Sequence, residues 1–109
     1  GLRPPVVVTS AGAEWGARGA SLSAELKDLG DASSVEVGFE YRKKKSTAEM
    51  YEPDDVWKTV GKKMQTLSSP GSFEAVLSKV DSHREWEYRA VAKHPKVTLY
   101  GITETLSAK

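Results

Sequence analysis

The chain has 109 residues and no cysteine, and its 16 lysines and arginines nearly balance its 15 acidic residues, leaving a formal net charge of +1. A chain of this length forms one domain that buries about two thirds of its unfolded surface, so it can fold without covalent links. The missing cysteines exclude disulfides, cysteine-bound zinc and thiol catalysis. The balanced charge and the lack of a long apolar run argue against nucleic acid and membranes as partners. The chain also has no Asn and a single Gln, Gln65, which favours a heat-tolerant (thermophile) source.

The N-terminal part of the chain predicts a linker followed by two strands. Residues 1–5 contain two prolines and predict a linker, and residues 6–9 predict a first edge strand. Residues 10–19 are rich in glycine around Trp15 and predict a loop. Over residues 20–27 apolar side chains alternate with polar ones, which is the pattern of a half-buried strand.

The middle of the chain combines a heavily apolar strand with a long polar connection. In residues 35–42 valine, phenylalanine and tyrosine alternate with glutamate, glycine and arginine, which predicts a third strand with a dry inner face. Residues 42–55 are charged and interrupted by a proline, so we expect a long exposed connection. A strand resumes over residues 56–60 and continues over residues 64–67 after a bulge.

The C-terminal part contains the clearest strand of the chain. Residues 73–77 predict a strand after a Pro-Gly turn, and residues 86–92 alternate tryptophan, tyrosine and alanine with charged or apolar outer residues. Residues 97–106 predict the last strand, with a bulge at Gly101 and a short tail over residues 107–109. About seven short strands with no convincing helix predict an all-β, antiparallel two-sheet sandwich.

Five segments carry a family resemblance: residues 20–26 (ASLSAEL), 29–30 (LG), 33–42 (SSVEVGFEYR), 65–73 (QTLSSPGSF) and 87–92 (EYRAVA). Together they resemble the fibronectin type III-like repeats of bacterial and archaeal surface and secreted proteins, which are commonly fused to polysaccharide-degrading enzymes. The resemblance covers residues 6–106 and implies a fibronectin type III or immunoglobulin-like sandwich in an extracellular or cell-surface protein. It bears on the fold more than on function, because such sandwiches host many roles.

The chain departs from the family pattern at two places. Trp86 stands where the family usually carries the tyrosine of the tyrosine corner, and an indole has no hydroxyl and can only donate through its ring N–H. The usual corner hydrogen bond must therefore be replaced or lost. The connection over residues 42–55 is also longer than the tight turn of most such repeats, so a feature specific to this chain is expected there.

Aromatic residues near loops are the first candidates for ligand binding. Trp57, Tyr51 and Trp15, together with Tyr100, are predicted at strand ends or in loops, where flat rings can stack on sugars. The alternative is that each ring packs on the sandwich or covers a sheet edge.

Lysines form the second candidate set. Lys62, Lys63 and Lys93 are predicted to share one end of the sandwich, where they could meet an anionic polymer such as a uronate polysaccharide. The run over residues 42–45 is expected at the opposite end. The alternative is a set of solvated loops that keep the domain soluble.

The sequence contains no arrangement that predicts catalysis or metal binding. His83 and His94 are expected at opposite ends of one strand and so cannot share a zinc ion. Asp54 and Asp55 lack the alternating oxygen ligands of a calcium loop. No phosphate-binding loop or catalytic triad appears, so we expect neither enzymatic activity nor a cofactor.

These observations favour a non-catalytic accessory module of a larger extracellular protein. We expect it to act as a spacer or domain-packing element, in the setting of a carbohydrate-active enzyme that the resemblance implies. Its partners would then be the neighbouring domains of the same chain, and the isolated domain would be a monomer. Two alternatives stay open: a carbohydrate-binding module that uses exposed aromatics beside the 42–55 connection, and a protein-docking or adhesion domain that uses an open sheet edge.

Overall fold

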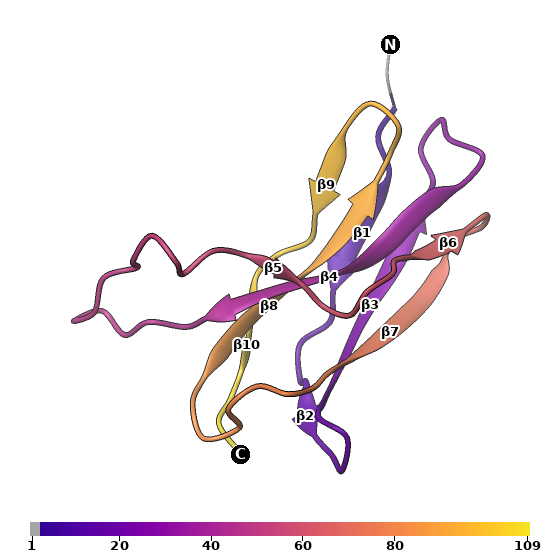
Figure 1. The fold of residues 1–109 in the computed structure, drawn as a ribbon. Helices are drawn as coiled ribbons and strands as arrows, with labels where there is room; N and C mark the ends of the chain where they lie inside the picture. The colour runs from indigo at the N-terminus through magenta and orange to yellow at the C-terminus, as the bar shows by residue number, and fades with distance from the viewer. Residues whose placement is uncertain (1–2) are drawn as a thin grey trace.

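A computed structural model describes residues 3–109, and in this part of the chain two antiparallel sheets pack face to face (Figure 1). No helix occurs in the described residues, and accordingly none of them forms a helix able to cross a membrane. The predicted all-β, two-sheet sandwich is confirmed.

The smaller sheet is built around the alternating segment predicted over residues 20–27. It contains β1 (Val6–Thr9), β2 (Glu14–Trp15), β3 (Ala20–Asp28) and β7 (Gly71–Leu77). β1 and β2 pair with successive parts of one edge of β3, and β7 pairs with the other edge. On β3 every second side chain, from Ala20 to Leu26, is buried, as the alternation predicts.

The larger sheet contains six strands. They are β4 (Val35–Lys43), β5 (Lys58–Thr59), β6 (Gln65–Leu67), β8 (Trp86–Lys93), β9 (Thr98–Tyr100) and β10 (Glu104–Leu106). β4 and β8 pair along their whole length and form the centre, with β5 and β6 on the outer edge of β4, and β9 and β10 on the outer edge of β8. The ten segments therefore lie in seven rows, which agrees with the predicted number of strands.

Three predicted boundaries were wrong. The strand expected over residues 56–60 is reduced to Lys58–Thr59. Trp57 does not pair with β4, and its ring lies on the outer face of the sheet against Arg42. The expected loop over residues 10–19 contains the two-residue strand β2. The predicted last strand over residues 97–106 is divided into two, and the interruption begins at Gly101, where a bulge was predicted and where Thr9 approaches closely.

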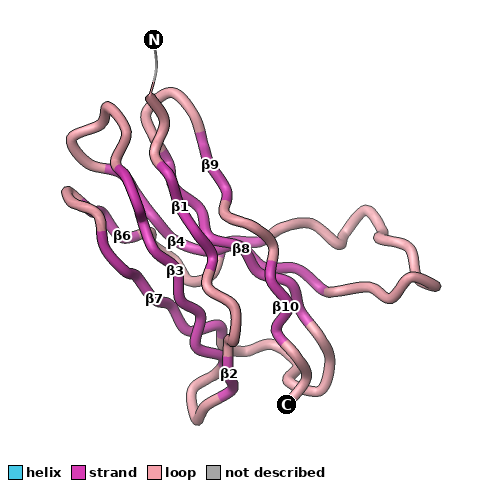
Figure 2. Tube along the Cα trace, turned by 180° about the vertical axis from the view of Figure 1, so that it is seen from behind, coloured by secondary structure: helices cyan, strands magenta, loops and turns pink. Residues whose placement is uncertain are grey.

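Arg3 and Lys109, in the predicted linker and tail, both make hydrogen bonds to the rest of the domain. Arg3 donates from its backbone to Asp31 and from its guanidinium to Asp28, so the described residues of the predicted linker lie on the β3–β4 turn. Residues 1–2 of that linker lie outside the described residues. At the other end the amide of Lys109 donates to the carbonyl of Ser82 in the β7–β8 connection. The chain thus enters at one end of the sandwich and leaves at the other (Figures 1 and 2).

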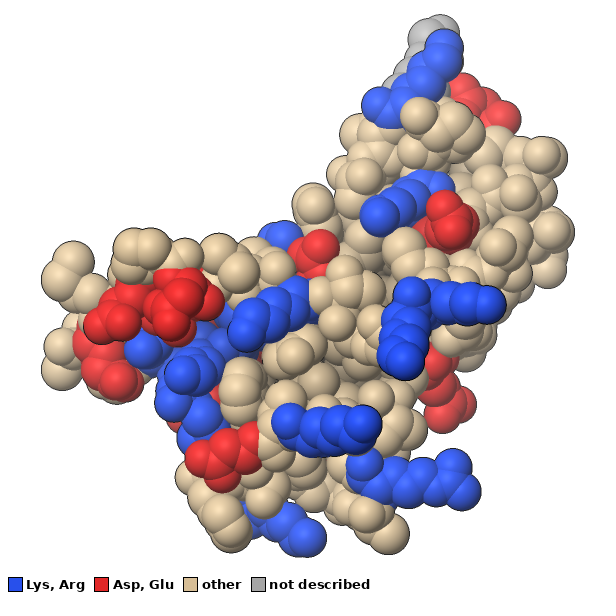
Figure 3. All heavy atoms as spheres, viewed as in Figure 1, with Lys and Arg blue, Asp and Glu red and all other residues tan. Residues whose placement is uncertain are grey.

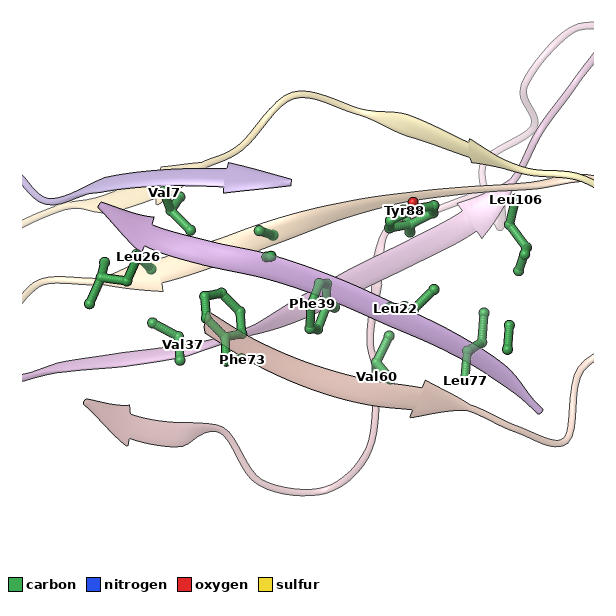
Figure 4. Packing of buried hydrophobic residues seen from close by; sticks show 14 of the residues in the cluster. Val7, Leu22, Leu26, Val37, Phe39, Val60, Phe73, Leu77, Tyr88 and Leu106 are labelled. Atoms are coloured by element: carbon green, nitrogen blue, oxygen red, sulfur yellow. The ribbon is translucent and has the colours of Figure 1, made fainter. Parts of the chain in front are cut away.

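The core lies between the two sheets and is dominated by a few large side chains. Figure 4 shows Phe39 of β4 beside Phe73 of β7, and their ring centroids are 5.2 Å apart. Tyr88 of β8 is fully buried, and its hydroxyl donates to the carbonyl of Ser10 at 2.6 Å. Burial raises the pKa of Tyr88, because the phenolate would lose its hydration there.

Trp86 makes a hydrogen bond that replaces the one made by the tyrosine of the tyrosine corner. The indole Nε1 of Trp86 donates to the carbonyl of Asp81 at 2.8 Å, and the indole is almost completely buried. The connection from β7 to β8 is therefore pinned to the start of β8 by an N–H donor instead of a hydroxyl.

A threonine inserted between the sheets joins β1 to β8. The buried amide of Ala90 donates to Oγ1 of Thr9 at 2.9 Å, while the neighbouring carbonyl of Ala90 accepts from Gly101. We expect Thr9→Val, which keeps the shape but removes the acceptor, to lower the free energy of unfolding by about 1–3 kcal/mol. Urea denaturation measures this loss.

Thr66→Val on the exposed face of β6 is the matched control, since its hydroxyl faces solvent and the change should stay within about 0.5 kcal/mol. Equal losses in the two variants would contradict the role of the Thr9 hydroxyl.

Candidate functional site

The outer face of the larger sheet carries two cross-strand ion pairs at its centre. The register places Glu40 of β4 opposite Arg89 of β8, and Arg42 of β4 opposite Glu87 of β8. Arg89 reaches Oε1 of Glu40 through Nη2 at 2.7 Å and Nε at 3.0 Å, and Nε of Arg42 lies 3.1 Å from Oε1 of Glu87. All four side chains are at most 27% exposed, so the pairs are shielded better than ordinary surface ion pairs.

Three aromatic rings lie against the two guanidinium groups. Cζ of Arg42 is 4.3 Å from the ring centroid of Tyr51 and 4.5 Å from that of Trp57. Cζ of Arg89 is 4.1 Å from the centroid of Trp57 and 3.8 Å from that of Tyr100. We call these five residues the aromatic–arginine ladder. A guanidinium over an aromatic face is attracted to the electrons of the ring, and more strongly where water is partly excluded.

The ladder is assembled from four separate segments, because Tyr51 and Trp57 both belong to the connection over residues 44–57. Arg42 and Arg89 come from the two central strands, Tyr100 ends β9, Trp57 precedes β5, and Tyr51 comes from the long connection over residues 44–57. The hydroxyl of Tyr51 also donates to Glu87, and this bond to a carboxylate, followed by partial burial, raises the pKa of Tyr51. The connection is thus fastened to the sheet at its middle.

The 44–57 connection projects from the sandwich as a separate arm (Figures 1 and 2). Nζ of Lys45 lies 3.2 Å from Asp55, so an ion pair joins the two ends of the arm. The amide of Glu52 also donates to Asp55 at 2.7 Å. This amide, and after it the ammonium of Lys45, lowers the pKa of Asp55. The carboxylate of Asp55 therefore closes the arm when it is ionised.

The ladder leaves its outer rings partly open. Tyr51 is 43% exposed and Tyr100 is 47% exposed, while Trp57 between the two arginines is half-buried. The nearby carboxylates of Glu40 and Glu87 are already used in ion pairs with Arg89 and Arg42. Fixed, partly open rings among charged groups can stack on flat or ring-shaped ligands.

The other predicted binding residues lie elsewhere. Trp15 belongs to the smaller sheet, packs against the core and donates from Nε1 to the carbonyl of Ser107 at 2.8 Å. This is the edge-covering alternative, and we do not include Trp15 in the site. Lys62 and Lys63 lie in the β5–β6 turn, whereas Lys93 ends β8 on the other side of β4. The structure therefore does not gather the three lysines into one patch at one end of the sandwich.

The two histidines lie as expected. His83 precedes β8 and His94 follows it, where Nε2 of His94 lies 2.7 Å from Oδ1 of Asp31. The carboxyl pKa of Asp31 is lowered by the backbone amide of Arg3 first and by His94 second. Within residues 3–109 no cluster of three or more histidine and acidic side chains is placed to hold a metal ion.

Sequence reasoning missed the two arginines and their acidic partners. Arg42 belongs to a basic run that predicts a solvated loop, and Glu40, Glu87 and Arg89 occupy ordinary wet-face positions. The sequence did contain one signal for these pairs, namely the opposite charges that alternate along each strand. Such charges can pair across a sheet when the two strands are neighbours. Using it requires the register of β4 against β8, which the sequence does not provide.

Comparison with known proteins finds a solved structure of similar fold but no matching family. The chain matches no known protein family and no curated protein. Among solved structures it is similar to the sensor domain of the anti-sigma factor RsgI4 from Pseudobacteroides cellulosolvens, with a TM-score of 0.55 and 12% identity. The match covers 99% of this chain and 97% of that one. The two chains share a β-sandwich fold.

Proposed function

We propose that this chain is a non-catalytic accessory module of a larger extracellular protein and that it binds a polysaccharide through the aromatic–arginine ladder. One observation carries the proposal: three rings, two from the 44–57 connection and one from β9, are held on two guanidinium groups across the outer face of the larger sheet. The core does not account for these rings, because the hydrophobic cluster is complete without Tyr51, Trp57 and Tyr100.

The geometry of the ladder suits a sugar ligand. The apolar face of a sugar ring stacks on a flat aromatic side chain, and the hydroxyl groups around it need charged or polar partners such as arginine and glutamate. Both kinds of group are present on one face of the sheet. The ion pairs also hold the rings in place before binding, which reduces the entropy lost when a ligand binds.

The extracellular setting rests on the resemblance to fibronectin type III-like repeats of surface and secreted proteins. A β-sandwich of the same fold serves as a sensor domain in RsgI4, so this architecture is used for sensing in another protein. This supports a recognition role for the present chain, although the low identity carries no ligand across.

The first test is a titration of intrinsic tryptophan fluorescence with a panel of neutral and acidic polysaccharides. Wild-type protein should give a saturable change, and Trp57→Ala should bind at least about tenfold more weakly, because it removes the central ring of the ladder. Tyr100→Ala should weaken binding in the same direction.

Trp15→Phe is the control, since Trp15 lies in the other sheet and phenylalanine keeps an aromatic ring there while losing the hydrogen bond to Ser107. It should bind as wild type does while removing one background fluorophore. A flat response of folded wild-type protein across the whole panel would contradict the proposal.

The spacer role is the second candidate, and the position of the chain ends favours it. Arg3 is tied to the β3–β4 turn and Lys109 to the β7–β8 connection, which lie at opposite ends of the sandwich (Figure 1). A module of this kind holds its neighbours about one domain length apart. Small-angle scattering of the module with one neighbouring domain attached would show an extended arrangement if this role is correct, and a side-by-side arrangement if it is not.

A further inference from the structure

A cleft opens at the end of the sandwich where the 44–57 arm leaves the sheet. Its volume is about 430 Å³, within the range of about 300–1,000 Å³ that is usual for small-molecule sites. One wall is the arm, the other is the β7–β8 connection, and the floor includes Tyr41, Val80 and Trp86. The rings of Tyr41 and Trp86 meet edge to face with centroids 5.8 Å apart. The floor is therefore formed by aromatic and aliphatic side chains, with the guanidinium of Arg84 5.6 Å from the ring centroid of Trp86.

The walls of this cleft are charged, with an excess of positive groups. Five cationic side chains and three carboxylates line it. Arg42 and Asp55 are already paired, with Glu87 and Lys45 respectively. Lys43, Lys58 and Lys79 have no ion-pair partner among the described residues. Figure 3 shows charged groups of both signs gathered over the projecting arm. The cleft thus holds lysine ammonium groups that are available to an anion.

The three lysines reach the cleft from three different strands or connections. Lys43 ends β4, Lys58 begins β5 beside Tyr41, and Lys79 lies in the β7–β8 connection. Lys79 is also the one residue other than glycine with a positive φ, 63°, in the described part of the chain. Such left-handed residues carry strain and occur more often than average at ligand sites.

The remaining charges limit the kind of anion that fits. Asp54 and Asp81 also face the cleft, and Oδ1 of Asp81 already accepts a hydrogen bond from the amide of His83. These carboxylates would repel a doubly charged phosphate but can accept hydrogen bonds from hydroxyl groups. Lysine ammonium groups, which bind as point charges, suit a single carboxylate. A sugar acid fits these features: its ring can lie on the floor, its hydroxyl groups can donate to the carboxylates, and its single carboxylate can bind the ammonium groups.

We propose that this cleft binds a uronate unit of the polysaccharide, with its carboxylate between Lys43, Lys58 and Lys79 and its ring against the apolar floor. The inference rests on the proposed function and specifies its ligand class. Arg42 lines the cleft and also stacks on Trp57, and the neighbours of Trp57 on both sides, Val56 and Lys58, line the cleft as well. The cleft and the ladder therefore adjoin along residues 56–58.

The test compares trigalacturonate with its methyl ester, which has the same rings but no charge, by isothermal titration calorimetry. Wild-type protein should bind the acid at least about tenfold more tightly than the ester. The triple variant Lys43→Gln, Lys58→Gln, Lys79→Gln should lose this preference and still bind the ester as wild type does.

A triple variant with the same change in net charge is the control. Lys62→Gln, Lys63→Gln, Lys93→Gln removes three lysines outside the cleft, and it should keep the preference for the acid. Equal losses in the two triple variants would overturn the inference, because the attraction would then depend on net charge and not on the cleft.

The outcomes separate this inference from the proposed function. Wild-type protein that binds acid and ester equally would overturn the uronate assignment and leave the ladder as the binding face. A preference for the acid that survives in Trp57→Ala, at unchanged affinity, would support the cleft and contradict the ladder. Wild-type protein that binds neither sugar would overturn the uronate assignment. The polysaccharide panel would then show separately whether the ladder binds a sugar.

Discussion

Replacing Phe39 by alanine is expected to lower the free energy of unfolding by about 3–5 kcal/mol. Phe39 is 1% exposed and projects from β4 into the middle of the sandwich, where its ring contacts Phe73 of the opposite sheet. The substitution removes this contact between aromatic rings of the two sheets and leaves a cavity that close-packed neighbours can fill only partly.

Urea denaturation followed by both tryptophan fluorescence and far-ultraviolet circular dichroism measures this loss. Val76→Ala on the outer face of β7 is the control, because Val76 is 45% exposed and its truncation should change the free energy of unfolding by about 0.5 kcal/mol or less. A loss below about 1 kcal/mol for Phe39→Ala would contradict the assigned core.

Gly30→Ala should cost at least about 2 kcal/mol of unfolding free energy, since it combines backbone strain with a steric clash. Gly30 has φ of +70°, in the left-handed region that side chains disfavour. A Cβ atom there would lie 2.2 Å from the carbonyl oxygen of Arg3 and 2.6 Å from the carbonyl carbon of Pro4. The segment before β1 must therefore move away from the β3–β4 turn.

Gly12→Ala separates the two contributions. Gly12 has φ of +86° but no atom within 4 Å of the added Cβ. Gly12→Ala should therefore lower the free energy of unfolding only by the cost of backbone strain, about 1–2 kcal/mol. Thermal unfolding of the two variants gives the difference. Equal melting temperatures would show that the contact between residues 3–4 and the turn contributes nothing to stability.

Part of the candidate site was accessible from the sequence. Tyr51 and Trp57 were predicted because they are aromatic residues in or beside a long polar connection, and both belong to the ladder. Trp15 satisfied the same criterion, yet it covers the edge of the smaller sheet through its bond to Ser107. Composition and position near a loop do not distinguish these two outcomes, because the difference lies in which distant segment the ring meets.

The cleft could not be predicted for a related reason. Its lysines are far apart in the sequence, and Lys58 reaches Tyr41 only because β5 folds back along β4 after the arm. The predicted lysine patch combined Lys62, Lys63 and Lys93 by their expected loops, whereas β4 lies between those loops in the sheet. Loop positions relative to one another depend on register, which a local pattern does not contain.

The sequence by itself determined the strands, their inner and outer faces and the two-sheet class. In residues 20–26 a period of two is enough to assign burial, whereas in residues 86–92 Val91 on the outer face is buried as well, because neighbouring strands of the sheet cover it. Only the tertiary structure decided which charges pair, which rings stack on them and where a cleft opens. Those properties need the β4–β8 register and the return path of the 44–57 arm, and both arise from contacts between residues distant in the chain.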